Sequence, residues 1–291
     1  MGFASFLYRQ VFVRPRPLPK DLSLHDQTIL ITGANSGIGL EAARQCVFLN
    51  AATLILAVRS ASKGEDAKVD VLKSNPDSKT KVEVWHLDLE SFESVLALGK
   101  RAQTLPRLDI AMLNAGAFKF KWTTAPSTDF ESSVQINHLS TALLSLLLLP
   151  VLRRTSSALG HPTRLTFTSS EVHMMTPFKE QKADNILARL NDQKFFGDTM
   201  DRYSVTKLLN VFWGLELASR VSEGGLLLMD AAVVKGSNTH GKYLSEAKIV
   251  EVSPFVRSED GRKVQTCLWD ETVAVFRDVV PEATLGELLN I

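Results

Sequence analysis

The sequence predicts a three-layer α/β fold: a doubly wound parallel sheet covered by helices on both faces. Two observations carry this prediction. Short apolar runs rich in β-branched residues alternate with segments at helical spacing, and the first of these runs ends at a glycine-rich turn. Continuous apolar runs are typical of parallel strands buried on both faces, and the crossovers between such strands are nearly always right-handed. At 291 residues the chain can form one such domain with a sizeable core.

Five strands are expected, in order along the chain. They are residues 28–32, 53–58, 82–87, 109–114 and 164–169. Helical spacing over residues 38–49 follows the first strand, a polar helix through Lys73 follows the second, and Ser91 is placed to cap the helix after the third. The most apolar stretch, residues 143–152, is too short to span a membrane and is expected to be a buried helix end.

The composition argues against several classes of protein. Hydrophobic residues make up 45% and charged residues 22%, with a net charge of +1, which is typical of a soluble globular protein and not of a nucleic-acid binder with its basic stripe. Cys46 and Cys267 form no CxxC pair, and no secretory signal is recognisable, so reduced thiols in a cytosol-like compartment are expected. The six histidines are scattered singly, so no metal site is predicted.

Residues 1–24 are predicted to form an N-terminal arm ahead of a single domain over residues 25–291. The first twenty residues contain four basic and no acidic side chains. We expect the arm to pack on the domain of a cytoplasmic protein. The alternatives are an amphipathic helix that makes weak contact with a membrane surface and a transit peptide.

The motif TGANSGIG, residues 32–39, places Gly33, Gly37 and Gly39 between the first strand and the first helix. Glycine permits positive φ and lets the backbone approach a ligand closely, while the helix start offers N–H groups to a pyrophosphate. The spacing GxxxGxG differs from the common GxGxxG, and a plain tight turn is the alternative. Its position after the first strand favours a Rossmann-type dinucleotide site, to which Ser36 and Ile38 also belong.

The end of the second strand discriminates between the two nicotinamide dinucleotides. An acidic residue at this point would bind the ribose hydroxyls of NAD, whereas a basic residue would accept the 2′-phosphate of NADP. Arg59 stands here, Lys63 follows one turn later, and residues 57–62 contain no Asp or Glu. The sequence therefore predicts NADP as the cofactor, with a solvated surface arginine as the alternative.

Two further strand ends belong to the same predicted site. Asp88 follows the third strand, where its carboxylate could accept a hydrogen bond from the adenine amino group. Asn114, Ala115 and Gly116 follow the fourth strand, where small residues leave room for the nicotinamide ribose. Open parallel sheets bind ligands at the carboxyl ends of their strands, which is where all four residues lie.

Candidate catalytic groups occur in the second half of the chain. Tyr203 and Lys207, in YSVTK, are four residues apart and share a helix face. A phenol titrates near 10, so acid/base work at neutral pH requires a lowered pKa, which the lysine and a cationic nicotinamide would favour. Two serines in TSSEVH follow the fifth strand, and one could hold a substrate oxygen; capping of a turn is the alternative. Asn137 lies within a long predicted helix, where it either holds a water or is simply exposed.

Taken together, TGANSGIG, NAG, the helical asparagine, the serine pair and YxxxK resemble the short-chain dehydrogenases/reductases over about residues 25–220. The chain is most similar to the retinol-dehydrogenase-like and WW-domain-oxidoreductase-like branch, whose fungal members modify polyketides or terpenoids. The tail over residues 240–272 resembles that of the same members. The resemblance implies hydride transfer between NADP(H) and a ketone or alcohol.

The resemblance also implies a role for each matching residue. Tyr203 would be the general acid/base and would also contact the cofactor, and Lys207 would lower the pKa of Tyr203 and bind the nicotinamide ribose. Ser170 would orient the substrate carbonyl, and Asn137 would hold a water in a proton relay to Lys207. Ile38 and Asn114 would line the cofactor.

Two features depart from the family pattern. Ser170 lies 33 residues before Tyr203, a longer interval than usual, so residues 173–202 are expected to form a loop or short helix at the substrate mouth. No proline occurs between Pro177 and Pro254, where the family has a Pro-Gly turn after a sixth strand. The apolar residues 224–234 could be that strand or a later helix. On the helical reading, roughly fifty residues with strand six and the lid are missing.

Two functions remain open at this level. The first is an active NADP-dependent reductase acting on an apolar ketone or alcohol. The second is a redox-silent protein that binds NADP and acts as a non-redox enzyme or a partner subunit. A homodimer formed through the apolar residues 127–154 and 203–220 is expected from analogy with the family.

Overall fold

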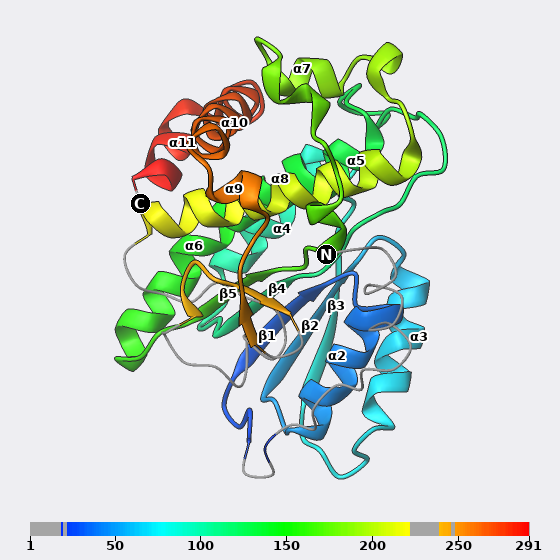
Figure 1. Ribbon diagram of the computed structural model, residues 1–291. Helices are drawn as coiled ribbons and strands as arrows, with labels where there is room; N and C mark the ends of the chain where they lie inside the picture. Colours follow the sequence, from blue (N-terminus) through cyan, green and yellow to red (C-terminus); the bar gives the residue numbers. More distant parts are fainter. Residues whose placement is uncertain (1–18, 20–21, 222–238, 246–247, 291) are drawn as a thin grey trace.

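A computed structural model describes residue 19 and residues 22–221, 239–245 and 248–290. A parallel sheet lies between two helical layers, and further helices cover one of these layers from outside (Figure 1). The strand order is β3-β2-β1-β4-β5, with all pairs parallel. The strands are β1 (Thr28–Thr32), β2 (Thr53–Val58), β3 (Lys81–His86), β4 (Ile110–Leu113) and β5 (Arg164–Phe167). This architecture confirms the predicted doubly wound fold.

Each face of the sheet has its own core because side chains alternate along the strands. In β1, Ile29 and Ile31 pack on the face covered by α2 and α3, whereas Leu30 faces the opposite core. The covering helices of the first face are α2 (Gly37–Phe48) and α3 (Ala61–Leu72). Those of the second are α4 (Phe92–Gln103), α6 (Ser140–Leu159) and α8 (Thr199–Arg220). Burial on both sides explains the nearly continuous apolar sequence of the strands.

The strand order reverses between β1 and β4, which are paired with each other. The chain runs outward from β1 to β2 and β3 and then returns to add β4 and β5 on the other side. The loops after β1 and β4 therefore diverge to opposite faces and leave a crevice at the carboxyl ends of these strands. The predicted glycine turn and the NAG segment both lie at this crevice.

The apolar helix predicted to be buried is indeed a core helix. Before α6 the chain forms the short α5 (Ser132–Val134) and a π-helical turn, Gln135–Leu139. Within the described residues, the helical stretch Ser132–Leu159 alone is long and apolar enough to cross a membrane. Its most apolar part, 18 residues long, is 94% buried in the fold. The apolar sequence is thus explained by packing.

The C-terminal segment adds a second shell of helices over α6 and α8. After a small antiparallel pair, β6 (Tyr243–Ser245) and β7 (Lys248–Val250), come α9 (Pro254–Arg257), α10 (Glu259–Arg277) and α11 (Glu282–Leu289). Helix α10 packs on α8, and α11 packs on α6. Trp213 of α8 stacks on Trp269 of α10 with ring centroids 4.4 Å apart. Apolar faces that suggested a homodimer are thus covered in part by the chain itself, and the dimer stays a prediction.

Sequence and structure differ mainly at the ends of elements. Strand β4 ends at Leu113, one residue before its predicted end, and β5 ends at Phe167, two residues before its predicted end. The hydrogen bonds between the two strands stop here because the following residues turn toward the crevice. Among the described residues, no strand pairs with the outer edge of β5. Residues 226–234, whose strand or helix character the sequence left open, and nearly all of the predicted arm, 1–24, lie outside the described residues.

Candidate active site

The glycine turn has the backbone geometry that its sequence predicts. Gly33 and Gly37 have φ values of +67° and +54°, in the left-handed region that favours glycine. A Cβ atom on Gly39 would lie 2.5 Å from both the Asn114 Nδ2 atom and the Gly33 carbonyl oxygen. The turn therefore packs directly against the segment that follows β4, and side chains at these positions would push the two apart.

The N-terminus of α2 is open toward the crevice. The helix begins at Gly37, and the side chain of its N-cap residue, Ser36, makes no capping hydrogen bond. No acidic residue occurs in the first turn, and the Ile38 side chain is 70% exposed. Exposed N–H groups at the positive end of a helix dipole are the arrangement that binds a pyrophosphate. These residues fit a bound dinucleotide.

The NAG segment after β4 is fastened to β1 and lies close to the candidate catalytic groups. The Asn114 side chain donates to the Thr32 carbonyl at 3.0 Å, and the Ala115 N–H donates to the Thr32 hydroxyl at 2.9 Å. A Cβ atom on Gly116 would lie 3.2 Å from Asn137 Oδ1 and 3.3 Å from Lys207 Nζ. A glycine at position 116 thus allows the cofactor crevice and the catalytic residues to meet.

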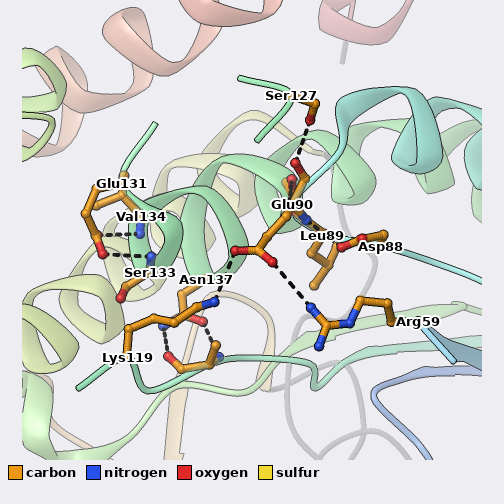
Figure 2. A network of polar contacts seen from close by, with 12 residues as sticks. Arg59, Asp88, Leu89, Glu90, Lys119, Ser127, Glu131, Ser133, Val134 and Asn137 are labelled. Atoms are coloured by element: carbon orange, nitrogen blue, oxygen red, sulfur yellow. Dashed lines mark hydrogen bonds and ion pairs between the residues drawn. The ribbon is translucent and has the colours of Figure 1, made fainter. Parts of the chain in front are cut away.

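The predicted 2′-phosphate end of the site contains an acidic residue that the sequence analysis missed. Arg59 follows β2, and its Nη1 atom lies 3.3 Å from Glu90 Oε2 (Figure 2). Asp88, predicted to bind adenine, accepts a hydrogen bond from the Glu90 N–H at 2.9 Å. Lys63 is exposed on the first turn of α3. Arg59 and Glu90 are 31 residues apart in the sequence, so no local sequence pattern predicts their contact.

Tyr203 and Lys207 lie on one face of α8, as predicted. Lys207 Nζ is 5.5 Å from the centre of the Tyr203 ring and donates to the Thr168 carbonyl at 2.9 Å. The lysine is only 3% exposed, and burial lowers its pKa to about 8. The lowering of the Tyr203 pKa by Lys207 together with a bound cationic nicotinamide stays a prediction. Among the protein's own groups, burial raises the pKa of Tyr203. Desolvation of the phenolate outweighs the nearby ammonium.

The two serines after β5 have different surroundings. The Ser169 hydroxyl donates to the Lys207 carbonyl at 2.9 Å and is engaged in holding α8 against β5. The Ser170 hydroxyl makes a longer contact, 3.4 Å from the Val172 N–H, and Ser170 lines the same cavity as Tyr203. Of the two, Ser170 is the one placed to meet a ligand beside Tyr203.

Asn137 is fully buried in the π-helical turn, which excludes the exposed asparagine considered from the sequence. Its Oδ1 atom accepts from the Ala117 N–H at 2.7 Å, and its Nδ2 atom donates to the Ala117 carbonyl and the Thr206 hydroxyl, both at 2.9 Å. The side chain therefore ties the loop after β4 to α8. Local π geometry is frequent at functional sites because it redirects a side chain from the regular ladder.

A cavity of about 880 Å³ opens beside Tyr203 and Ser170. Its wall comes largely from the segment between these residues, which forms the 3-10 turns Glu171–Met174, Lys179–Lys182 and Gln193–Phe195 and the short α7 (Ile186–Leu190). The predicted loop or short helix at the substrate mouth corresponds to this wall. Phe118, which the sequence analysis did not select, also lines the cavity, with its ring centre 5.3 Å from that of Tyr203.

The described part of the chain contains no group of three or more His, Cys, Asp or Glu side chains that could hold a metal ion. Cys46 is buried and Cys267 exposed, and both are free thiols.

Comparison with known proteins agrees with this geometry. Residues 27–177 match the family model described as short chain dehydrogenase. The short chain dehydrogenase sol3 of Alternaria solani is 48% identical over 221 residues, which cover 76% of each chain. This chain belongs to the short-chain dehydrogenase family. It is an oxidoreductase of that family, whose members bind nicotinamide cofactors and small-molecule substrates.

A second relative covers nearly the whole chain. The short-chain dehydrogenase fogG of Aspergillus ruber is 33% identical over 321 residues, which cover 94% of this chain and 91% of the relative. The aligned length exceeds the 291 residues of this chain, so the relative contains residues that this chain lacks. The predicted shortening after the Tyr203–Lys207 helix stays a prediction.

Solved structures share the fold. The Escherichia coli oxidoreductase yciK has a TM-score of 0.51 at 25% identity and covers 69% of this chain and 73% of its own. A short chain dehydrogenase of Escherichia coli CFT073 complexed with NADPH has a TM-score of 0.52 at 24% identity, covering 71% and 76%. The reductase A1-R' complexed with NAD has a TM-score of 0.54 at 15% identity, covering 70% and 76%. Proteins of this fold thus include complexes with both dinucleotides.

Proposed function

We propose that the protein is an NADP-dependent reductase that converts an apolar ketone into an alcohol. The observation that carries the proposal is that Ser170 and Tyr203 line one cavity, with Lys207 beside the Tyr203 ring and next to the glycine at position 116. When bound, the reduced nicotinamide supplies the hydride. The protein's own residues must then orient the carbonyl and provide a proton to its oxygen.

Tyr203 is the proposed proton donor. Its burial raises the pKa of the phenol, so at neutral pH the side chain carries the proton that a newly formed alcohol oxygen requires. The Ser170 hydroxyl is proposed to donate a hydrogen bond to the same substrate oxygen and to hold it beside the phenol.

Lys207 is proposed to stabilise the charge on Tyr203, and Asn137 is proposed to hold the surrounding segments in position. With a pKa of about 8, Lys207 is predominantly charged at neutral pH and favours the phenolate left by proton transfer. Asn137 fixes the loop after β4 against α8 through Ala117 and Thr206. The proton relay through a water at Asn137 remains a prediction from the family resemblance.

The proposed substrates are apolar or polycyclic ketones from fungal secondary metabolism, polyketides or terpenoids. Support comes from the apolar cavity residues Phe118, Met175, Pro177, Phe195, Phe196 and Met200 and from the similarity to fungal dehydrogenases. The retinol-dehydrogenase-like branch and a cytoplasmic location are proposed on the sequence resemblance and composition alone.

The test is NADPH oxidation, followed by absorbance, with the purified protein and a panel of monocyclic and polycyclic ketones. Turnover is expected with at least one ketone. Tyr203→Phe should lower kcat by about 10²- to 10⁴-fold and leave NADPH binding intact, because only the transferable proton is removed. Tyr243→Phe is the matched control and should retain activity. NADPH binding without turnover of any ketone would instead support the redox-silent alternative.

A further inference from the structure

An acidic side chain reaches the end of β2 from the turn that follows the neighbouring strand β3. The segment 57–62 contains no acidic residue, which is why the sequence predicts NADP at this position. In the folded chain, the carboxylate of Glu90, which lies beyond the end of β3, occupies the space beside Arg59 (Figure 2). The charge at this end of the crevice is therefore set by both residues.

Glu90 is the fixed member of the pair. Its backbone N–H donates to Asp88 Oδ1 at 2.9 Å, and its carbonyl accepts from the Ser127 hydroxyl at 2.7 Å. Its Oε1 atom accepts from Lys119 Nζ at 3.1 Å. The Glu90 side chain is 15% exposed, whereas that of Arg59 is 66% exposed. Arg59 can therefore move toward or away from a carboxylate that stays in place.

Glu90 carries its negative charge at neutral pH. Its burial by itself would raise the pKa of the carboxyl group, but hydrogen bonds to the carboxylate and the neighbouring cations Lys119 and Arg59 outweigh this effect and lower the pKa. An anionic group thus faces the guanidinium that is proposed to bind the 2′-phosphate of NADP.

A carboxylate treats the two dinucleotides differently. It competes with a 2′-phosphate for Arg59 and repels it, since both groups are anions. A ribose 2′-hydroxyl is instead a hydrogen-bond donor that a carboxylate can accept. The charge of Glu90 therefore weakens the binding of NADP relative to that of NAD.

We propose that Glu90 is a specificity-determining residue that narrows the difference in affinity between NADP and NAD. The proposal rests on the proposed function, because it takes Arg59 as the ligand of the 2′-phosphate. The Asp88 and Ser127 side chains bond to the Glu90 backbone. Among the described residues, only Lys119, Arg59 and Ser132 act on its carboxylate. Glu90→Gln therefore keeps the backbone contacts and the size of the side chain and removes its charge.

The experiment measures dissociation constants of adenosine 2′,5′-bisphosphate and of 5′-AMP by calorimetry, with NADPH and NADH as full-length probes. These adenosine fragments report on the 2′-phosphate without any contribution from the nicotinamide pocket or from catalysis. Glu90→Gln should tighten binding of the bisphosphate by about two- to fivefold, the range expected for an exposed ion pair, and leave 5′-AMP unchanged. Glu93→Gln removes an exposed acid at the start of α4 and should change neither constant.

Arg59→Gln distinguishes the role of Glu90 from the assignment of Arg59 to the 2′-phosphate. If it weakens bisphosphate binding but Glu90→Gln leaves it unchanged or weaker, the role of Glu90 is overturned and the NADP assignment stands. If Arg59→Gln has no effect, the assignment of Arg59 to the 2′-phosphate fails, and the role of Glu90 fails with it. Should Glu90→Gln not fold, Glu90→Asp withdraws the carboxylate by one methylene and should tighten bisphosphate binding by a smaller factor, whereas no gain would contradict the proposal.

Discussion

The cofactor-binding region, residues 22–170, and the cavity-forming region, described over residues 171–221, 239–245 and 248–290, reach their functions by different physical means. In the first region the cofactor site is formed mainly by the backbone, through glycine turns, strand ends and an open helix N-terminus. In the second region, side chains from separate elements build a wall around Tyr203 and hold α8 in place. A backbone site tolerates little change in shape, while a side-chain wall can be altered residue by residue to suit a substrate.

The largest effect on stability is expected where the C-terminal helices meet α8. Trp269 stacks on Trp213 at 4.4 Å and lies under the Arg220 guanidinium at 4.5 Å. Trp269→Ala should lower the free energy of unfolding by about 3–5 kcal/mol, because a large buried ring is lost and a cavity remains. Urea denaturation measures this loss.

The neighbouring exposed residue Asp270 provides the control, since Asp270→Ala should stay within about 0.5 kcal/mol of the wild type. A loss below about 1 kcal/mol for Trp269→Ala would show that α10 adds little to the fold. The cavity-forming region would then depend on α8 and the preceding wall alone.

Lys207 connects the two regions, and its burial lowers the stability of the folded protein by an amount that depends on pH. Burial lowers its pKa from 10.5 to about 8, so the folded state holds the charged form less well than the unfolded chain does. This cost is fully present below pH 8 and disappears as the pH rises through 10.5. Lys207→Met should therefore be stabilised relative to the wild type by about 3 kcal/mol more at pH 7 than at high pH.

Chemical denaturation of both proteins between pH 7 and pH 10 follows most of this difference. Two stability profiles that run parallel over the range would contradict the burial of a charged lysine. Because the comparison is between two proteins at the same pH, the titration of other groups cancels.

A smaller effect is expected in the glycine turn. A Cβ atom at Gly39 would meet Asn114 and the Gly33 carbonyl at 2.5 Å, so Gly39→Ala must separate the turn from the segment after β4. We expect a loss of about 1–3 kcal/mol in stability and at least tenfold weaker NADPH binding. Gly286→Ala, in α11, has open space around its Cβ position and should be neutral or slightly stabilising. Equal effects of the two substitutions would contradict the close approach at Gly39.

Most of the cofactor-binding region could be predicted from the sequence because its signals are local. A strand, its glycine turn and the next helix follow one another in the chain, so the motif at residues 32–39 identifies the crevice without knowledge of distant contacts. The ends of the strands are predicted less accurately than the strands themselves. A strand ends where its hydrogen bonds to the neighbouring strand stop, and this point differs from the end of the apolar run. Tyr203 and Lys207 were found because four residues make one turn of α8.

The rest depends on residues that are far apart in the sequence. Glu90 contacts Arg59 across 31 residues, and Phe118 meets the Tyr203 ring from the loop after β4. The raised pKa of Tyr203 follows from burial, which the sequence could not quantify. The packing of α10 on α8 and of α11 on α6 likewise joins distant parts of the chain, so the apolar helix faces alone do not predict it. The homodimer through these faces stays a prediction.

The central claim is that these two regions form a single site for hydride transfer. Its most direct test uses NADPH carrying deuterium at both hydrogen positions of nicotinamide C4, with mass spectrometry of the products from a panel of monocyclic and polycyclic ketones. Deuterium on the carbinol carbon with the wild type, and its loss with Tyr203→Phe, is the predicted result. A protein that binds NADPH tightly but transfers deuterium to no ketone would contradict the account.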